Sequence, residues 1–136
     1  MFTSLTPNLM VEDVAQTVAF YRDALGFAVT DTAPEQGAPV WATVRAGAVS
    51  LMFQARPSLE EELPVFAGRP IGGALTLYIG VDDADALYAR VHDKAQVVKE
   101  PVTMPYHARE FYIQDPNGYI LGFSSPIASD QAADAQ

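Results

Sequence analysis

The sequence predicts an α+β fold of two tandem βαβββ modules, whose mixed four-stranded sheets curve around a cavity. The segment Val11-Glu12-Asp13-Val14 returns seventy residues later as Val81-Asp82-Asp83-Ala84, and each copy lies between a strand pattern and a helix pattern. A hairpin pattern ends each half of the chain. In both halves the alternation gives the sheet one apolar and one polar face, so we expect each helix on an apolar face and the cavity between the polar faces.

The first module is expected over residues 5–54 and begins with a strand and a helix. Residues 5–11 alternate between apolar and polar side chains, as a strand does. Asp13 is a favourable N-cap, and Gly26 is a favourable residue for ending the helix. The buried stripe of this helix is predicted to consist of Val14, Val18, Tyr21 and Leu25.

Two strand patterns complete the first module after a short strand at residues 27–30. Residues 40–54 are typical of a hairpin, which we expect to turn at Ala46-Gly47. In this pairing one face is apolar and carries Val40, Ala42, Val44, Val49, Leu51 and Phe53. The opposite face carries Trp41, Thr43, Arg45, Ser50, Met52 and Gln54.

The second module, expected over residues 74–125, repeats the pattern of the first. Residues 55–73 should form a linker with one helical turn, because proline and glycine recur through this segment. Residues 75–81 then alternate as a strand does, and Asp83 is the expected cap of the second helix. A short strand is predicted at residues 97–98.

The last hairpin is the clearest feature of the sequence. Its turn, Asp115-Pro116-Asn117-Gly118, joins a turn-opening aspartate, a proline with fixed φ and two residues that tolerate positive φ. The cleanest separation of apolar from polar residues places Phe111 opposite Leu121 and Arg109 opposite Phe123. The polar face then carries Glu110, Tyr112, Ile120, Gly122 and Ser124.

Composition restricts the function classes. The 136 residues suit one domain, expected over residues 1–125, and a disordered polar tail is expected over residues 126–136. The net charge of −9 argues against a nucleic acid or an anionic membrane as partner, because both bind basic surfaces. The chain has no cysteine, no signal-peptide pattern and no apolar run of roughly eighteen residues, so we expect a cytoplasmic protein.

Two segments resemble the vicinal oxygen chelate superfamily. They are residues 11–27, which include Phe20-Tyr21-Arg22-Asp23-Ala24-Leu25-Gly26-Phe27, and residues 109–119, which include the turn of the last hairpin. The superfamily contains glyoxalase I, extradiol dioxygenases, fosfomycin-resistance enzymes and bleomycin-resistance proteins. The resemblance extends over residues 5–125 and implies the paired-module fold. It implies no single activity, because the fold carries isomerases, dioxygenases, transferases and binding proteins.

The metal enzymes of this superfamily bind their ion through His, Glu or Gln residues at inward positions of four strands. The resemblance carries these positions over to Thr6, Ser50, Thr76 and Gly122. None of these residues is a usual ligand for a divalent metal, and glycine has no side chain. The two histidines, His92 and His107, fall in the second helix and in the loop before the last hairpin. We therefore expect neither a metal ion nor another cofactor.

The resemblance is then strongest to metal-free members typified by bleomycin-resistance proteins. The leading hypothesis is a small-molecule-binding protein that sequesters an aromatic or cationic compound. Aromatic rings, neutral hydrogen-bonding groups and one carboxylate are expected on the inward faces. The predicted binding residues are Asn8, Trp41, Ser50, Met52, Gln54, Thr76, Tyr78, Glu110 and Tyr112. By resemblance we also expect a homodimer, with the modules paired within one chain or between two.

Other hypotheses stay open beside this one. Glu110 and Tyr112 are candidate catalytic residues, as acid and base in a lyase or isomerase, or in a dioxygenase-like enzyme whose metal site the sequence does not reveal. The sheet faces could instead serve only self-association, with their aromatic residues filling an interface. Glu110 could also be structural and pair with Arg109 or Arg45.

Overall fold

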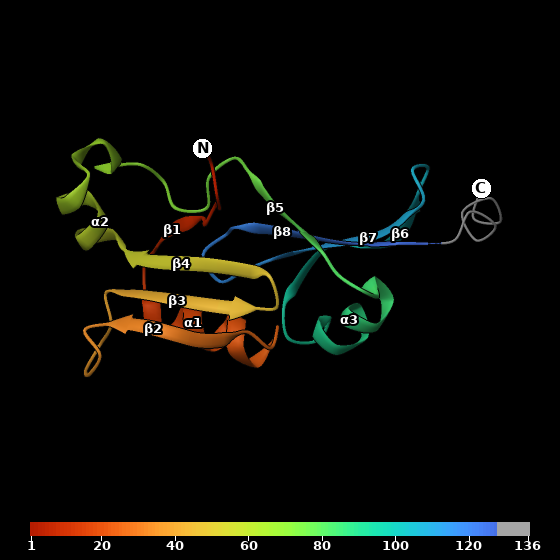
Figure 1. Ribbon diagram of the computed structural model, residues 1–136, viewed down its shortest axis with the longest axis horizontal. Helices are drawn as coiled ribbons and strands as arrows, with labels where there is room; N and C mark the ends of the chain where they lie inside the picture. Colours follow the sequence, from red (N-terminus) through yellow and green to blue (C-terminus); the bar gives the residue numbers. More distant parts are fainter. Residues whose placement is uncertain (128–136) are drawn as a thin grey trace. The chain divides into compact units, whose positions relative to one another are not determined.

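The computed structural model describes residues 1–127, and the chain divides into two compact units between Gly72 and Gly73. Each unit is built around a four-stranded mixed sheet with a helix packed on it (Figure 1). The predicted α+β fold with two βαβββ modules is therefore confirmed. Pro126 still belongs to the last strand, and the predicted disordered tail lies, from residue 128 onwards, outside the described part of the chain.

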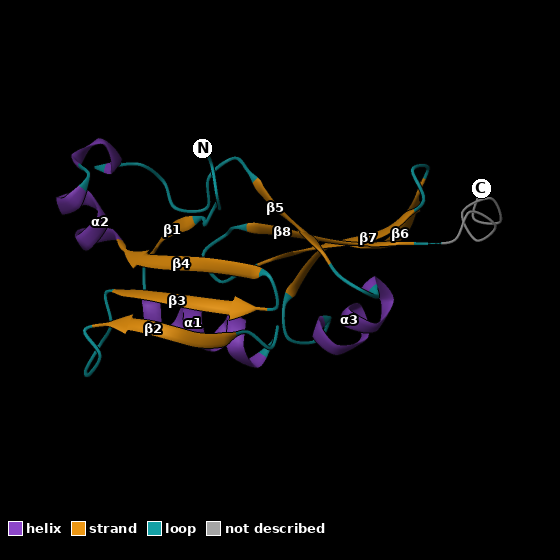
Figure 2. Ribbon diagram, in the orientation of Figure 1, coloured by secondary structure: helices purple, strands orange, loops and turns teal. Residues whose placement is uncertain are grey.

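The first unit consists, in chain order, of β1 (Asn8–Val11), α1 (Val14–Asp23), β2 (Ala28–Ala33), β3 (Trp41–Ala46), β4 (Val49–Ala55), α2 (Arg56–Glu62) and the 3₁₀ helix η1 (Pro64–Phe66). The strand order is β1-β4-β3-β2, in which β1 and β4 are parallel and the other pairs are antiparallel (Figure 2). The ring of Tyr21 contacts the ring of Phe53 at a centroid distance of 4.8 Å. Helix α1 therefore covers the apolar face of this sheet.

The second unit consists of β5 (Thr76–Gly80), α3 (Ala84–Val91), β6 (Gln96–Met104), β7 (Ala108–Gln114) and β8 (Ile120–Pro126). The strand order, β5-β8-β7-β6, repeats the arrangement of the first unit, with β5 and β8 parallel. The ring of Tyr88 on α3 contacts the ring of Phe111 at a centroid distance of 5.2 Å, so α3 covers the face that carries Phe111. The edge strand β6 breaks its register with β7 twice, between Val97 and Lys99 and between Lys99 and Val102.

Helices α1 and α3 both start directly after the predicted aspartates. Asp13 Oδ1 accepts a hydrogen bond from the Gln16 amide at 2.9 Å, and Asp83 Oδ1 accepts one from the Ala86 amide at 3.1 Å. These bonds satisfy backbone donors that the first helical turn leaves without an intrahelical partner. The predicted stripe of α1 is buried, and Gly26 follows the helix with a φ of 79°.

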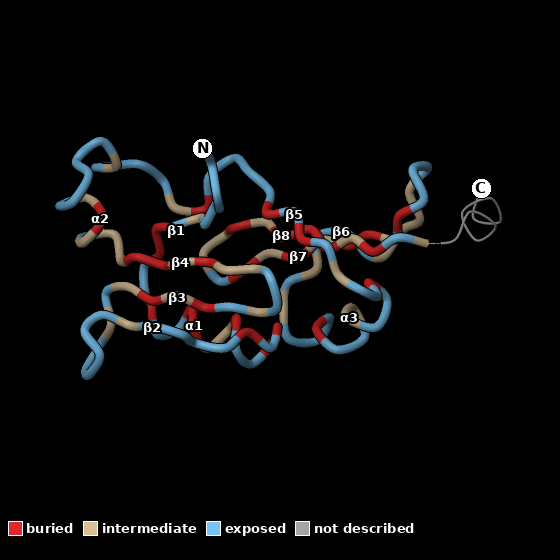
Figure 3. The backbone as a smooth tube through the Cα atoms, in the orientation of Figure 1, coloured by how far each residue is buried: buried red, intermediate tan, exposed pale blue. Residues whose placement is uncertain are grey.

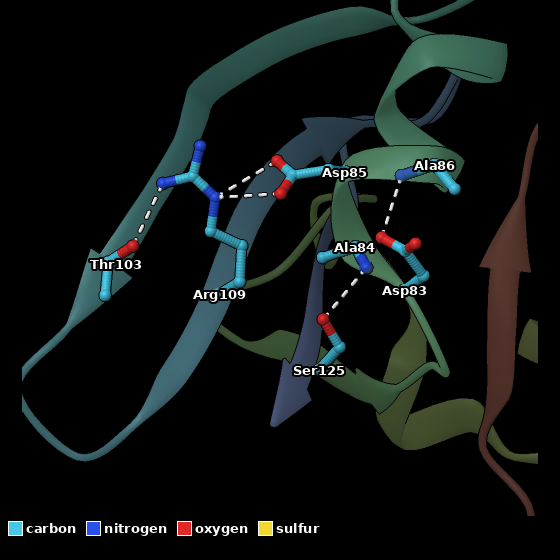
Figure 4. Close-up of polar contacts among 7 residues, drawn as sticks. All are labelled: Asp83, Ala84, Asp85, Ala86, Thr103, Arg109 and Ser125. Atoms are coloured by element: carbon cyan, nitrogen blue, oxygen red, sulfur yellow. Dashed lines mark hydrogen bonds and ion pairs between the residues drawn. The ribbon is translucent and has the colours of Figure 1, made fainter. Parts of the chain in front are cut away.

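Polar contacts fasten the start of α3 to its sheet (Figure 4). The Ser125 hydroxyl on β8 accepts a hydrogen bond from the Ala84 amide at 2.9 Å. Arg109 Nε on β7 donates to both carboxylate oxygens of Asp85, at 3.0 and 3.2 Å. Its Nη1 donates to Thr103 Oγ1 on β6 at 3.1 Å. Because Ser125 and Arg109 alternate with the residues of the polar face, these contacts all lie on the helix side of the sheet.

The core of each unit lies between its helix and its sheet, and the central strands carry many of the buried residues (Figure 3). The first strand is shorter than predicted, because β1 starts at Asn8 and Leu5 is exposed. Met10 is buried, although it alternates with Leu9 and Val11 and so belongs to the face that was expected to be polar. Strands β2 and β6 extend beyond their predicted ends. The linker is more regular than predicted, because buried Leu59 anchors a helix of 7 residues. Over residues 1–127, no helix has the length and apolar composition needed to cross a membrane.

The last hairpin keeps its predicted faces but has a different pairing. Phe111 lies opposite Phe123 rather than opposite Leu121. The Asp115 amide donates to the Tyr119 carbonyl at 2.9 Å, and this bond closes the loop around residues 116–118. The resulting shift is two residues, so each side chain stays on its predicted face.

Candidate functional site

A buried carboxylate is the centre of the candidate site. Glu110 lies on β7 and alternates with Phe111, so its side chain is on the face opposite α3. Only 1% of Glu110 is exposed. Its Oε2 atom accepts hydrogen bonds from the hydroxyls of Tyr78 on β5 and of Tyr106 in the β6–β7 turn, the second at 2.8 Å. We refer to these three residues and Ser124 on β8 as the Glu110 cluster.

Strand register brings the polar residues of the second unit onto one face. Glu110 pairs with Ser124, and in the neighbouring row Tyr78, Gly122 and Tyr112 pair across β5, β8 and β7. Directly paired residues in a sheet point to the same side. In these two rows β8 contributes a small side chain or none, so the longer side chains of β5 and β7 have room to lie over it.

The glycine of β8 makes room for one aromatic ring. A Cβ atom at Gly122 would lie 2.3 Å from Cε2 of the Tyr112 ring, which is closer than real Cβ atoms come to another heavy atom. The ring therefore lies directly over the glycine and takes the space of a side chain there. An aromatic ring thus occupies one of the positions that the resemblance assigns to a metal ligand.

Gly122→Ala is expected to lower the free energy of unfolding by about 1–3 kcal/mol, because the added methyl group forces the Tyr112 ring from its place. Gly80→Ala is the matched control. Gly80 lies on the same face of the same sheet, and a Cβ atom there would meet nothing within 4 Å. Urea denaturation of both variants measures the difference, and equal stability of the two would contradict the close contact at Gly122.

The β6–β7 turn brings Tyr106 to the cluster. The His107 amide donates to the Met104 carbonyl at 3.2 Å, and His107 adopts a positive φ of 63°. The His107 carbonyl accepts a hydrogen bond from the Ile127 amide at 3.0 Å, which ties the turn to the end of β8. Tyr106 can therefore reach Glu110, which lies four residues further along the chain, while the His107 side chain is exposed.

The cluster keeps Glu110 ionised at neutral pH. Burial alone would raise the pKa of Glu110. Two tyrosine hydroxyls and the Ser124 hydroxyl form hydrogen bonds with the carboxylate, and Lys99 adds a positive charge nearby. Together these contacts outweigh burial and hold the pKa of Glu110 below its ordinary value. Glu110 is therefore a fixed negative charge beneath the polar face.

The pKa values of two neighbouring tyrosines, Tyr106 and Tyr112, are raised rather than lowered. The hydrogen bond to the Glu110 carboxylate, and after it burial, raise the pKa of Tyr106. Burial, followed by the negative charge of Glu110, raises the pKa of Tyr112. Both phenols keep their protons at neutral pH, and the Tyr106 hydroxyl donates its proton to Glu110.

The polar face of the first sheet is organised around buried Gln54. Gln54 Oε1 accepts a hydrogen bond from Asn8 Nδ2 at 2.9 Å. Its Nε2 donates to Ser58 Oγ at 3.0 Å and to Glu62 Oε1 at 2.9 Å, both on α2. The amide thus joins β1, β4 and α2. Trp41 pairs with Gln54 and is half-buried beside this network.

The positions that the resemblance assigns to metal ligands do not suit a divalent ion. Thr6 precedes β1, Thr76 opens β5, and both residues are exposed. Register within the seventy-residue repeat makes Met52, not Ser50, the β4 counterpart of Gly122. Hydroxyls, a thioether and a glycine lack the imidazole and carboxylate donors that such an ion prefers. Within residues 1–127, no three His, Asp or Glu side chains are grouped so that they could hold a metal.

Arg109 and Arg45, the expected partners of Glu110, form other contacts, and so does His92. Arg109 lies on the helix face in its ion pair with α3, and Arg45 Nε donates to a backbone carbonyl of its own hairpin turn at 3.1 Å. Tyrosine hydroxyls, rather than an arginine, therefore hold the Glu110 carboxylate. The ring of His92 stacks on Tyr88 at the end of α3, with ring centroids 5.3 Å apart.

The structure thus groups the predicted binding residues by unit. Tyr78, Glu110 and Tyr112 lie together on the second sheet, and Asn8 and Gln54 are hydrogen-bonded on the first. Sequence reasoning did not select Tyr106. Its one local signal is a tyrosine beside a turn, close in sequence to the carboxylate of the polar face.

A sequence model of the Glyoxalase/Bleomycin resistance protein/Dioxygenase superfamily matches residues 4–123. No curated protein sequence matches the chain. Among solved structures, the chain is similar to a protein of unknown function from Agrobacterium tumefaciens, with 19% identity and a TM-score of 0.77 over 93% of this chain and 96% of that one. It is similar to a glyoxalase/bleomycin resistance protein/dioxygenase from Nocardioides, with 20% identity and a TM-score of 0.74 over 95% of this chain and 87% of that one. It is also similar to a bleomycin-binding protein from Streptomyces verticillus complexed with copper(II)-bleomycin, with 25% identity and a TM-score of 0.63 over 92% and 97%.

Proposed function

Because the chain belongs to the Glyoxalase/Bleomycin resistance protein/Dioxygenase superfamily, we propose that it is a small-molecule-binding protein that holds an aromatic or cationic compound on the polar face of its second sheet. The Glu110 cluster is the observation that carries this proposal, because it joins a fixed negative charge to two exposed tyrosine rings. Exposed rings offer flat apolar contact area, and a carboxylate attracts cations.

The charge states favour binding over acid–base catalysis by Glu110 and Tyr112. A general base works best when its pKa lies near the operating pH. Hydrogen bonds keep the pKa of Glu110 low, and burial raises the pKa of Tyr112. At neutral pH the carboxylate is therefore a weak base and the phenol a weak acid, which suits groups that hold a ligand in place.

The proposal includes function without a divalent metal. Its support is that the four positions assigned to metal ligands by resemblance carry no imidazole or carboxylate, and that the Tyr112 ring lies over one of them, Gly122. Protein purified without chelators should carry no stoichiometric iron, zinc or nickel by elemental analysis. A stoichiometric ion whose removal abolishes ligand binding would overturn this part of the proposal.

Calorimetric titration with three probes tests the binding role. Metal-free bleomycin is the first, because a bleomycin-binding protein is among the similar structures, and quinoline and 1-methylquinolinium are a neutral and a cationic aromatic probe. We expect at least one of them to bind, and Tyr78→Ala to weaken its binding by roughly tenfold or more. Val65→Ala truncates an exposed apolar residue of the first unit and should leave binding unchanged. Absence of binding, or binding that is indifferent to Tyr78→Ala, would contradict the proposal.

A further inference from the structure

We propose that Tyr78 and Tyr106 form an aromatic cage for a methylated ammonium group, with the Glu110 carboxylate, which accepts hydrogen bonds from both hydroxyls, as the opposite charge. The inference rests on the proposed function and names the chemical class of its ligand. Among the cationic groups of small molecules, the cage selects the kind that has no hydrogen-bond donor.

The two rings are exposed and yet fixed in place. Tyr78 is 55% exposed and Tyr106 is 56% exposed, although both hydroxyls donate to the same oxygen of Glu110. A tethered ring has lost much of its freedom before a ligand arrives, so binding costs less conformational entropy. One ring comes from β5 and the other from the β6–β7 turn, so the two approach this oxygen from different parts of the sheet.

The hydrogen bonds to Glu110 also strengthen the attraction between the two rings and a cation. A phenol that donates to a carboxylate gains some phenolate character, which increases the electron density on its ring face. A cation over the face of a tyrosine is attracted by this electron density. Glu110 therefore acts on a bound cation twice, through its own charge and through the rings that it polarises.

The burial of Glu110 decides which kind of cation fits. Only 1% of the residue is exposed, and its carboxylate already accepts hydrogen bonds from the cluster, so an N–H group of a ligand has no open path to it. A primary ammonium or a guanidinium group would lose hydrogen bonds to water without replacing them, which is unfavourable. A fully methylated ammonium has no N–H group to leave unsatisfied, and its methyl groups can contact the ring faces directly.

One residue near the cage opposes a cation. Lys99 is exposed on β6, and its positive charge acts on Glu110. The same charge repels a cation bound above the carboxylate. Lys99→Gln should therefore strengthen the binding of a cation and leave the binding of a neutral molecule unchanged.

Choline, 3,3-dimethylbutan-1-ol and ethanolamine test the cage, because they share one chain and differ only in its head group. The heads are a trimethylammonium, a neutral tert-butyl group of the same shape and a primary ammonium. In NMR titrations of the full chain we expect choline to bind about 3- to 30-fold more tightly than either of the others. Tyr106→Leu removes one ring and should abolish this preference.

Two charge variants, Glu110→Gln and Lys99→Gln, distinguish the contribution of charge to choline binding from the contribution of the rings. Glu110→Gln keeps the shape and removes the charge, so choline should bind about 3- to 10-fold more weakly while 3,3-dimethylbutan-1-ol binds as before. Glu61→Gln removes an equal charge from an exposed position on α2 and is the matched control. Lys99→Gln changes only an exposed residue, so its expected gain in choline affinity tests the cage even if Glu110→Gln fails to fold.

Three outcomes would overturn the cage. They are equal binding of choline and 3,3-dimethylbutan-1-ol, tighter binding of ethanolamine, and no binding of any of the three. The aromatic probes distinguish this failure from failure of the proposed function. If quinoline or 1-methylquinolinium still binds in a manner that depends on Tyr78, the binding role stands without the cage.

Discussion

Replacing Phe111 with alanine is expected to lower the free energy of unfolding of the second unit by about 3–5 kcal/mol. Phe111 is 0% exposed, and its ring lies between α3 and the sheet. Its centroid is 5.1 Å from that of Phe123 and 5.2 Å from that of Tyr88, so truncation leaves a cavity lined by two other rings. Urea denaturation followed by circular dichroism measures the loss.

Phe2→Ala is the control for the same chemical change, because Phe2 is 97% exposed. Its effect should stay within about 0.5 kcal/mol. Phe111→Leu keeps most of the apolar volume and should cost clearly less than the alanine variant. A loss of less than about 1 kcal/mol in Phe111→Ala would contradict the packing of α3 on this face of the sheet.

Glu110→Gln is expected to lower the free energy of unfolding by about 1–3 kcal/mol at neutral pH, because phenols donate stronger hydrogen bonds to a carboxylate than to a neutral amide. The pKa of Glu110 in the folded protein lies below its ordinary value. The carboxylate therefore stabilises the fold fully above the unfolded pKa of about 4.3, and this contribution is lost as the pH falls through the lowered folded pKa. The stability difference between the two proteins should shrink in acid.

Urea denaturation from neutral pH down to about pH 3 measures this difference. Glu61→Gln, on the exposed side of α2, removes the same charge and should show no comparable loss of stability at neutral pH. A stability gap that grows in acid would mean that folded Glu110 takes up its proton more readily than the unfolded chain. That result would contradict the hydrogen-bonded carboxylate.

The faces of the strands could be predicted because side chains alternate with a period of two. An error of two residues in the last hairpin therefore left Phe111 on its correct face, although its partner was wrong. The first hairpin turns at Gly47-Ala48, one residue later than predicted, since adjacent small residues give no local signal for the exact turn. Both helix starts were predictable because Asp13 and Asp83 are strong local caps.

The candidate site could be predicted only in part. Tyr78 and Glu110 were expected on one polar face, because each has a place in an alternating strand. Tyr106 lies outside the strands, and its contact with Glu110 depends on the backbone geometry of a turn, which includes the positive φ of His107. Sequence periodicity has no information about such a turn. The contact between Gly122 and the Tyr112 ring likewise depends on a rotamer rather than on a pattern.

The two register breaks of β6 affect how this molecule meets its neighbours. An open sheet edge offers unpaired backbone donors and acceptors to a strand from another chain. Lys99, Glu100 and Pro101 fall between or within the breaks, and charge, a missing amide hydrogen and local bulging each disturb such pairing. Strand β6 is therefore a poor template for strand addition. Edge-to-edge aggregation through this edge of the second sheet is disfavoured.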